Sequence, residues 1–294
     1  KPQPADAAKT PQPRPEADKG YRRANISKAR FGDGERQKLL LNAYQLREKI
    51  NKVIIGQDEA AKGMQDRLVQ YLENVGTRTK DPVALHLIGL PGIGKSAMLD
   101  VLEGLGIGVV RIDAQRYVSP NNNFAEDLEG ALSEFVKDEK NKGKPLLLVI
   151  EELDKIPEKG GKGSLSGPEV TNSMIGALNQ ILTDGKLPSR YPFRPPLDLS
   201  NLFVVTTMNF APTDIERFSV DALGVEKSYY DFTREDFAKH NEWIRSESSA
   251  RYKVLSRLFR PNTVSRLAPN MVMLKSLSDE DYRKIAELTL NTAI

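Results

Sequence analysis

The sequence is most constrained by a glycine-rich segment from Gly89 to Ser96, which reads Gly-Leu-Pro-Gly-Ile-Gly-Lys-Ser. This segment fits the pattern G-x-x-x-x-G-K-[ST] without a gap, and an apolar run at 83–88 precedes it. Glycines at these positions let backbone N–H groups turn inward around phosphate oxygens, and a following helix directs its positive end at them. Lys95 can neutralise phosphate charge, and the Ser96 hydroxyl can ligate Mg²⁺. The sequence therefore predicts a phosphate-binding loop, or P-loop, for a nucleoside triphosphate, with Mg-ATP expected.

Short apolar runs alternate with helical patterns around this loop. We expect strands at 83–88, 109–112, 146–150 and 202–208, and helices at 95–105, 126–136 and 170–182. Strands that alternate with helices of about ten to fifteen residues are typical of βαβ units. The predicted fold class is therefore α/β, a parallel sheet flanked by helices.

Helical patterns also lie outside this alternation. Order is expected to begin near Glu35, and two amphipathic helices are expected before the P-loop, at 39–50 and 61–75. Further along, the expected elements are helices at 234–245 and 250–259, a short strand at 271–274 and a helix from Asp279. We interpret the end of the chain as the start of a small helical domain.

Composition excludes several classes of site. The chain has 294 residues, 39% of them hydrophobic, and no apolar run approaches the about 20 residues that a transmembrane helix needs. The absence of cysteine excludes disulfides, thiol catalysis and thiolate zinc sites, and two histidines leave little for a histidine metal cluster.

The sequence starts at Lys1 rather than Met, so we expect a processed or trimmed piece. We expect a cytoplasmic location, while an upstream signal or anchor stays open.

The basic charge is concentrated in the first residues. Residues 1–32 carry eight Lys/Arg and three Asp/Glu, so the rest of the chain sums to −2 although the whole chain is +3. Five of the first fifteen residues are proline. Because this segment has too few large apolar groups to offset its ordering entropy, we predict a disordered linker at 1–34. Contact with an acidic partner or a membrane surface is the alternative. The near-neutral body lacks the basic stripe of a dedicated duplex-DNA binder.

An acidic pair follows the expected strand at 146–150. Glu151 and Glu152 come directly after it, where open α/β sheets place their ligands. One acid can hold the water shell of a metal ion, and the next can orient and deprotonate an attacking water. The alternative is a solvated acidic turn.

Two further residues have side chains that can act on a triphosphate. Asn209 ends the apolar run 202–208, and its carboxamide can hydrogen-bond both a γ-phosphate and a nucleophilic water. The alternative for Asn209 is a turn residue. Arg266 follows Pro261, which breaks a helical pattern, so an exposed arginine near that turn can reach a phosphate on a neighbouring subunit. The alternative for Arg266 is a structural salt bridge.

In this order, the landmarks resemble those of AAA+ ATPases, most closely the Clp-type unfoldases and disaggregases and the related torsins. The G-Q-x-x-A segment at 56–60 resembles the one that these proteins place against adenine. The stretch 178–187 resembles their L-x-x-x-L-x-x-G-x-L pattern, and 259–266 resembles the F-R-P-x-x-x-x-R segment that carries their arginine finger. The resemblance runs from about Ile50 to Leu290.

The resemblance implies a set of site residues for ATP and Mg²⁺. It implies Glu152 as catalytic base, Asn209 as first sensor and Arg266 as a finger that acts in trans. It implies Ser96 and Glu151 as the metal ligands. The nucleotide contacts that it implies are Ile55, Gly56, Pro91, Gly92, Ile93, Gly94, Lys95, Ser96 and Ala97.

The resemblance also implies a domain organisation and an activity. An AAA+ nucleotide-binding domain is expected at 35–268, and the incomplete start of a lid domain at 269–294. The expected activity is ATP hydrolysis by a homo-oligomeric ring of the hexamer type, which remodels a protein substrate or a regulatory partner. Neither nucleic acid nor a membrane is an expected partner of this segment.

Three features depart from the family pattern. The metal-side acid, usually Asp, is Glu151 here, and the extra methylene shifts its carboxylate. The aromatic-glycine pore motif is absent from 113–126, where Tyr117 and Phe124 are the only aromatics. This absence weakens the expectation of substrate translocation by the Clp route. The shorter segment is closer to that of torsins. The second-sensor arginine of the Clp lid is not visible, so we expect a truncated or divergent lid.

Other functions stay open at this stage. A nucleotide-dependent switch or scaffold with little turnover, which needs an activator as torsins do, fits Glu151 and the missing pore motif. A nucleic-acid motor is disfavoured because the body is near neutral. A small-molecule P-loop kinase does not need Asn209 and Arg266 in this arrangement.

Four smaller features have modest interpretations. The segment 160–167 is expected to be a flexible loop or a substrate loop, and 190–194 a second pore loop or a packed hairpin corner. His86, inside an apolar strand, is expected to be a hydrogen-bonded core residue, and His240 with Trp243 is expected to pack.

Overall fold

The computed structural model describes most of the chain after the N-terminal segment. The described residues are 33–74, 82–118, 123–141, 144–156, 168–187, 196–199, 202–209 and 258–292, with isolated positions between 223 and 256. Several expected features lie outside them. These are the linker up to residue 32, the loops 160–167 and 190–194, and most of the helices expected at 234–245 and 250–259, with His240 and Trp243.

Five parallel strands form the main sheet. They are β1 (Val83–Gly89), β2 (Gly108–Asp113), β3 (Leu146–Glu151), β6 (Leu202–Asn209) and β7 (Met271–Met273). Their order across the sheet is β2-β3-β6-β1-β7, and every pair is parallel. A separate antiparallel pair joins β4 (Lys186–Leu187) to β5 (Leu197–Asp198). The four strands predicted from the apolar runs around the P-loop are confirmed.

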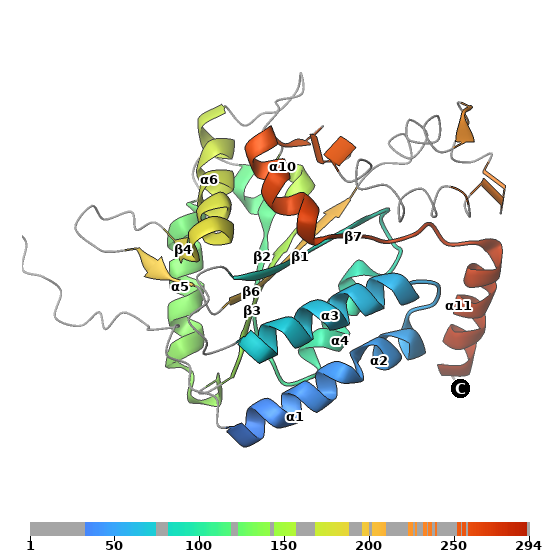
Figure 1. The fold of residues 1–294 in the computed structure, drawn as a ribbon, viewed down its shortest axis with the longest axis horizontal. Coiled ribbons are helices and arrows are strands. Elements are labelled where there is room, and N and C mark those ends of the chain that lie inside the picture. Colours follow the sequence, from blue (N-terminus) through green and yellow to red (C-terminus); the bar gives the residue numbers. More distant parts are fainter. Residues whose placement is uncertain are drawn as a thin grey trace, which may run out of the picture.

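Helices lie on both sides of this sheet. They are α1 (Asp33–Tyr44), α2 (Leu46–Val53), α3 (Asp58–Asn74), α4 (Lys95–Glu103), α5 (Phe124–Lys137), α6 (Pro168–Asp184), α10 (Pro261–Leu267) and α11 (Asp279–Thr292). Short 3-10 turns are η2 (Ala114–Val118), η3 (Glu139–Asn141), η4 (Leu153–Lys155) and η6 (Ala268–Asn270). In Figure 1, α1, α2 and α3 lie below the sheet, and α6 and α10 lie above it. The predicted class, a parallel sheet flanked by helices, is confirmed.

Burial explains why the central strands are continuous apolar runs. β3 and β6 each have a strand on both sides, and nearly all of their residues are buried. A parallel strand covered on both faces needs apolar side chains at every position, not at alternate ones. β2 lies at the edge of the sheet, and its fully buried residues alternate with partly exposed ones. The central strands therefore anchor the core, and their carboxyl ends share one edge of the sheet.

Three boundaries differ from the expectations. The first helix begins at Asp33, slightly before Glu35. The helix expected at 39–50 is divided at Gln45, whose N–H closes a turn onto the Asn42 carbonyl at 3.2 Å. β7 pairs with β1, so the α/β layer extends past residue 268, where we expect the nucleotide-binding domain to end.

None of the helices in the described part of the chain is both long and apolar enough to span a membrane.

His86 is fully buried in β1, and its Nδ1 lies 2.8 Å from Thr206 Oγ1 of β6. Its expected place as a hydrogen-bonded core residue is confirmed.

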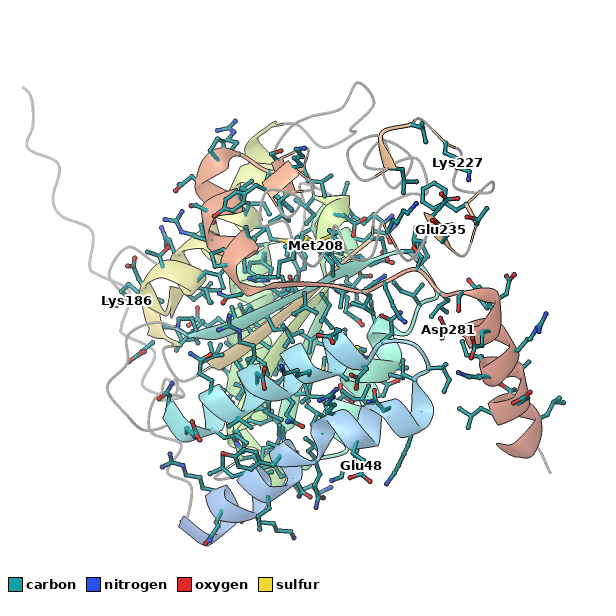
Figure 2. All side chains as sticks on the ribbon, turned by 45° about the vertical axis from the view of Figure 1, so that its right-hand side comes forward. Glu48, Lys186, Met208, Lys227, Glu235 and Asp281 are labelled. Carbon is teal, nitrogen blue, oxygen red and sulfur yellow. The ribbon has the colours of Figure 1, made fainter. Side chains whose placement is uncertain are left out.

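Gln57 links the N-terminal helices to the end of the chain. It is 2% exposed, in the turn between α2 and α3. Its Nε2 donates to the Lys275 carbonyl at 2.9 Å, and its Oε1 accepts the Lys275 N–H at 3.1 Å. Asp281, labelled in Figure 2 at the start of α11, lies beside the same turn, since a Cβ on Gly56 would be 3.0 Å from its carboxyl group. The turn that contains Gly56 and Gln57 is therefore held against Lys275 and the start of α11.

Replacement of Gln57 by Ala should destabilise the protein. The change removes two hydrogen bonds and leaves the partly buried N–H and carbonyl of Lys275 without these partners, which costs about 2–3 kcal/mol of unfolding free energy. Urea denaturation measures this loss. Gln37→Ala, at an exposed position of α1, is the control and should change the unfolding free energy by less than about 0.5 kcal/mol. Equal stabilities of the two variants would contradict the stabilising role of the Gln57 hydrogen bonds.

Candidate active site

A pocket of about 700 Å³ lies at the carboxyl ends of β1, β2, β3 and β6. Its lining residues are Pro91, Gly92, Gly94, Lys95, Ser96, Ala97, Asp113, Gln115, Glu151, Glu152, Thr207 and Asn209. Four chain segments meet here because parallel strands present their carboxyl ends at one edge, where α/β sheets bind ligands. The structure thus brings together the expected P-loop residues, the acidic pair and Asn209.

The P-loop backbone depends on two glycines. Gly92 has φ +76° and Gly94 has φ +103°, both in the left-handed region that favours glycine. A Cβ on Gly94 would also lie 3.0 Å from Ile54 Cγ2, so this glycine permits close approach of the segment before α3. Gly94 precedes α4, whose first backbone N–H groups have no intrahelical partners and can bind an anion.

Lys95 is buried, and its amine is hydrogen-bonded to carbonyl groups of its own loop. Its Nζ donates to the carbonyl oxygens of Gly89 at 2.9 Å and Leu90 at 2.6 Å. Burial lowers the pKa of Lys95 from 10.5 to about 8, and the nearby carboxylates of Asp154 and Glu152 oppose this shift. The amine therefore keeps its charge at neutral pH, next to the space where a phosphate would bind.

Glu151 is shared between the pocket and an arginine. Its Oε1 lies 3.8 Å from Arg111 Nη1. Arg111 also pairs with Asp100 at 2.7 Å and Glu103 at 2.5 Å, both on α4. The longer side chain of Glu, where the family usually has Asp, thus lies near a cation as well as near the pocket.

Glu152 has a strained backbone. Among the residues that the structure describes, it is the one non-glycine with positive φ, at φ 55° and ψ 42°. Such a left-handed conformation costs about 1–2 kcal/mol for a residue with a side chain, and strain of this kind clusters at functional sites. The Glu152 N–H donates to Thr207 Oγ1 at 3.2 Å. The chain thus turns abruptly after β3, and Glu152 is part of the pocket wall.

The backbone of Asn209 is held by a hydrogen bond. Its N–H donates to Asp154 Oδ1 at 2.7 Å, and the other oxygen of Asp154 lies 3.7 Å from Lys155 Nζ. The side chain of Asn209 is therefore left to line the pocket.

The pocket fits a triphosphate with Mg²⁺. A glycine cradle, a buried lysine, the Ser96 hydroxyl and carboxylates at one edge supply the donors and acceptors that such a ligand needs. In the described ranges, no group of three or more His, Asp or Glu side chains is arranged to hold a metal ion by itself. Mg²⁺ usually binds through one or two carboxylates together with substrate phosphates, so this donor set suits a metal that arrives with a nucleotide.

Three expected site residues lie outside the pocket wall or face away from it. Ile93 is buried, and its side chain packs against Gly89, so only its backbone is available to a phosphate. Ile55 and Gly56 form the turn next to the P-loop but do not line this pocket. Their expected contact with adenine stays a prediction.

Arg266 also lies away from the pocket of its own chain. It is partly exposed on α10 and donates to the Asn262 carbonyl at 2.6 Å, to the Asn262 side chain and to Thr183 Oγ1. No acidic partner of Arg266 is found among the described residues, and the alternative of a structural salt bridge stays untested. Its role in trans stays a prediction.

The sequence analysis missed four residues at this site. Asp113, the last residue of β2, and Gln115 line the pocket, and Asp113 lies opposite Glu151 in the β2–β3 pairing. Thr207 and Asp154 contact the backbones of Glu152 and Asn209. Position at a strand end could have indicated Asp113, because it follows an apolar run as Glu151 does. No local pattern marks the partners of the two backbone amides, since both bonds join distant segments.

The comparisons with known proteins agree with this geometry. The AAA family model, described as the ATPase family associated with various cellular activities, matches residues 85–221. The chain is 23% identical over 260 residues to the chloroplastic ClpA homolog of Brassica napus, an ATP-binding subunit of the ATP-dependent Clp protease, with 83% of this chain and 26% of that protein covered. It is 25% identical over 262 residues to the chloroplastic chaperone protein ClpC1 of Arabidopsis thaliana, with 83% and 25% covered.

A solved structure shows the same fold. The S. cerevisiae Hsp104-ADP complex matches with a TM-score of 0.51 and 18% identity, covering 89% of this chain and 40% of that one. The chain has the fold of the AAA+ ATPases, and in sequence it is similar to those of the Clp type. It spans about a quarter of the length of the curated relatives described above. The torsin part of the resemblance stays a prediction.

The two aromatic residues of the segment 113–126 are buried in the core. Tyr117 and Phe124 are both buried and pack edge to face, with ring centroids 5.4 Å apart. The Tyr117 hydroxyl donates to Asp127 Oδ2 at 3.0 Å. The departure from the pore motif is therefore also structural, because neither ring points into solvent.

Nucleotide affinity should fall as pH rises through the pKa of Lys95. The charged amine attracts phosphate, and with a pKa of about 8 its charged fraction falls about tenfold between pH 7 and pH 9. A fluorescent ADP analogue should therefore bind about tenfold more weakly at pH 9. Lys95→Arg, which stays charged, is the control: it should bind more weakly at every pH but without this slope. An equal slope in both proteins would contradict the role of Lys95.

Proposed function

We propose that this AAA+ domain binds Mg-ATP in the pocket at the strand ends and hydrolyses it there. The supporting observation is that one cavity gathers a P-loop, an acid with a strained backbone and a carboxamide from three separate segments. These are the groups that ATP hydrolysis needs: a phosphate cradle, a base for the attacking water and a contact for the γ-phosphate.

Each side chain has a distinct task in this proposal. Backbone N–H groups of the P-loop hold the phosphates, and Lys95 exchanges its carbonyl partners for β- and γ-phosphate oxygens. Glu152 accepts a proton from water as the water oxygen attacks the γ-phosphorus, and ADP leaves with the bond to that phosphorus broken. Asn209 orients the water and the γ-phosphate. Mg²⁺, when bound, neutralises phosphate charge, and Ser96 and Glu151 are the residues that would hold it.

Arg266 extends the site to a second subunit in this proposal. In its own chain Arg266 is partly exposed, and its guanidinium is hydrogen-bonded only to neutral groups among the described residues, so its charge is available to an anion. An arginine finger stabilises the charge that develops in phosphoryl transfer. A homo-oligomeric ring, of the hexamer type, would place Arg266 of one subunit at the pocket of the next. The output of such a ring would be the remodelling of a protein substrate or complex.

A nucleotide-dependent switch with little turnover is the second candidate. Two observations favour it. Arg111 lies near the carboxylate of Glu151 and competes with a metal for its charge. Tyr117 and Phe124 are buried, so the segment that carries the substrate-gripping aromatic in Clp unfoldases offers none here.

Glu152→Gln should separate the two candidates. The carboxamide cannot accept the proton from water, so the variant should bind ATP as tightly as the wild type and hydrolyse it at least about 100-fold more slowly. Phosphate release at saturating Mg-ATP and binding of a fluorescent ATP analogue measure the two properties. A wild-type rate no faster than that of Glu152→Gln would refute hydrolysis and leave the switch.

Arg266→Ala should reduce turnover only where subunits assemble. We expect the wild-type rate per subunit to increase with protein concentration, and the variant to bind ATP normally but to lose about 10³-fold or more of the rate in the assembled state. Arg67→Ala on α3, which removes an arginine with a similar intrachain bond, is the matched control and should keep the rate. A rate per subunit that is independent of concentration across the assembly range would exclude action in trans.

A further inference from the structure

Two hydrogen bonds join the end of β3 to the end of β6 beside the pocket. The Glu152 N–H donates to Thr207 Oγ1 at 3.2 Å, and the Asn209 N–H donates to Asp154 Oδ1 at 2.7 Å. The first bond runs from the β3 side to the β6 side, and the second runs back. We call this pair of bonds the clasp. Met208, labelled at the centre of Figure 2, lies between its two residues in β6.

The clasp begins where the sheet pairing stops. The register of β3 against β6 ends with Ile150 opposite Thr206. After this point the left-handed backbone of Glu152 turns the chain out of the sheet, so backbone ladder bonds can no longer align the two segments. A hydroxyl and a carboxylate supply the partners instead. The two residues whose N–H groups are held are the expected base and the expected sensor.

Burial makes these bonds hard for water to replace. Thr207 is 6% exposed, and the side chain of Asp154 is 11% exposed. Glu152 and Asn209 are themselves partly buried. A backbone N–H that is withdrawn from water and has no partner is destabilised, so each amide is held by its side-chain partner. The bond from Asn209 is also charge-assisted, which strengthens it and sharpens its geometry.

We propose that Thr207 and Asp154 are positioning residues for ATP hydrolysis. Thr207 fixes the backbone of Glu152, and Asp154 fixes the backbone of Asn209, so that the base and the sensor are aligned on the same water. This inference rests on the proposed hydrolysis and adds the residues that set its geometry. Two simpler roles compete with this inference. In the first, Thr207 fills space in the core and does nothing more. In the second, Asp154 serves only as the counter-charge of Lys95 and Lys155.

The Thr207 half is tested with a pair of near-isosteric variants. Thr207→Val keeps the shape and removes the acceptor, whereas Thr207→Ser keeps the hydroxyl. Misplacement of a reacting group by about 1 Å can cost about 100-fold in rate. We therefore expect Thr207→Val to lose about 10- to 100-fold in kcat with ATP affinity changed less than about threefold, and Thr207→Ser to stay within about threefold of the wild type.

The Asp154 half is tested by separating charge from hydrogen bonding. Asp154→Asn removes the charge but keeps an oxygen that can accept the Asn209 N–H, whereas Asp154→Ala removes both. Positioning predicts that Asp154→Ala loses about 10- to 100-fold in kcat and that Asp154→Asn retains most of it. A counter-charge role predicts instead that both variants lose activity equally and that both bind ATP more weakly. This second result would overturn the Asp154 half.

A double-mutant cycle with Glu152→Gln gives a readout that a structural effect would not reproduce. Once the base is removed, misplacing its backbone should slow hydrolysis little further, so Thr207→Val should have almost no added effect in that background. Equal fold-losses of kcat in both backgrounds, together with a parallel fall in melting temperature, would assign the effect to general destabilisation and overturn the inference.

The remaining outcomes separate the inference from the proposed function. If the wild type hydrolyses ATP faster than Glu152→Gln but Thr207→Val and Asp154→Ala both keep the wild-type kcat, the clasp is overturned and hydrolysis stands. If the wild type is no faster than Glu152→Gln, hydrolysis is refuted and the clasp has no catalytic role.

Discussion

The parallel pairing of β3 with β6 is the constraint on which the site depends. Both strands are buried, and their register runs from Leu146 opposite Leu202 to Ile150 opposite Thr206. A slip by one residue would move every side chain to the other face of the sheet. That register determines which residues stand together at the carboxyl edge, because the acidic pair and Asn209 follow directly from it. The register of the buried strands therefore determines which polar groups meet at the site.

Beyond the sheet, the site depends on backbone conformations that few residues tolerate. The left-handed glycines of the P-loop adopt theirs with little strain, whereas Glu152 adopts one that is unfavourable for its side chain. The energy that offsets this strain comes from neighbours: the bond to Thr207 on one side and the fully buried Leu153 on the other. A preorganised acid in this position needs no rearrangement when a substrate binds, which is the advantage of storing strain at a site. Glu151 is under a different influence, since Arg111 offers its carboxylate a partner before any metal does.

The sequence predicted the parts of the site that local pattern determines. The P-loop, the acidic pair and Asn209 each follow an apolar run, and a buried parallel strand is recognisable from that run alone. Thr207 and Asp154 were not predicted, because their partners lie 55 residues away and only the sheet register brings them together. The break at Gln45 and the pairing of β7 with β1 were missed for related reasons: one is a single turn inside a helical pattern, and the other is a contact between the two ends of the domain. Arg266 is placed by α10, but its expected partner belongs to another subunit, which one chain cannot supply.

The central claim is that the pocket at the strand ends holds Mg-ATP for hydrolysis, and a high-resolution structure of Glu152→Gln with Mg-ATP tests it most directly. The account predicts the triphosphate along the P-loop, with Lys95 Nζ moved from the carbonyls of Gly89 and Leu90 to phosphate oxygens. It also predicts Mg²⁺ next to Ser96 and the Glu151 carboxylate, and the Asn209 side chain within hydrogen-bonding distance, about 3.2 Å, of the γ-phosphate or of a water beside it. A nucleotide bound elsewhere, or a triphosphate in this pocket with Asn209 and residue 152 both remote from the γ-phosphate, would contradict the account.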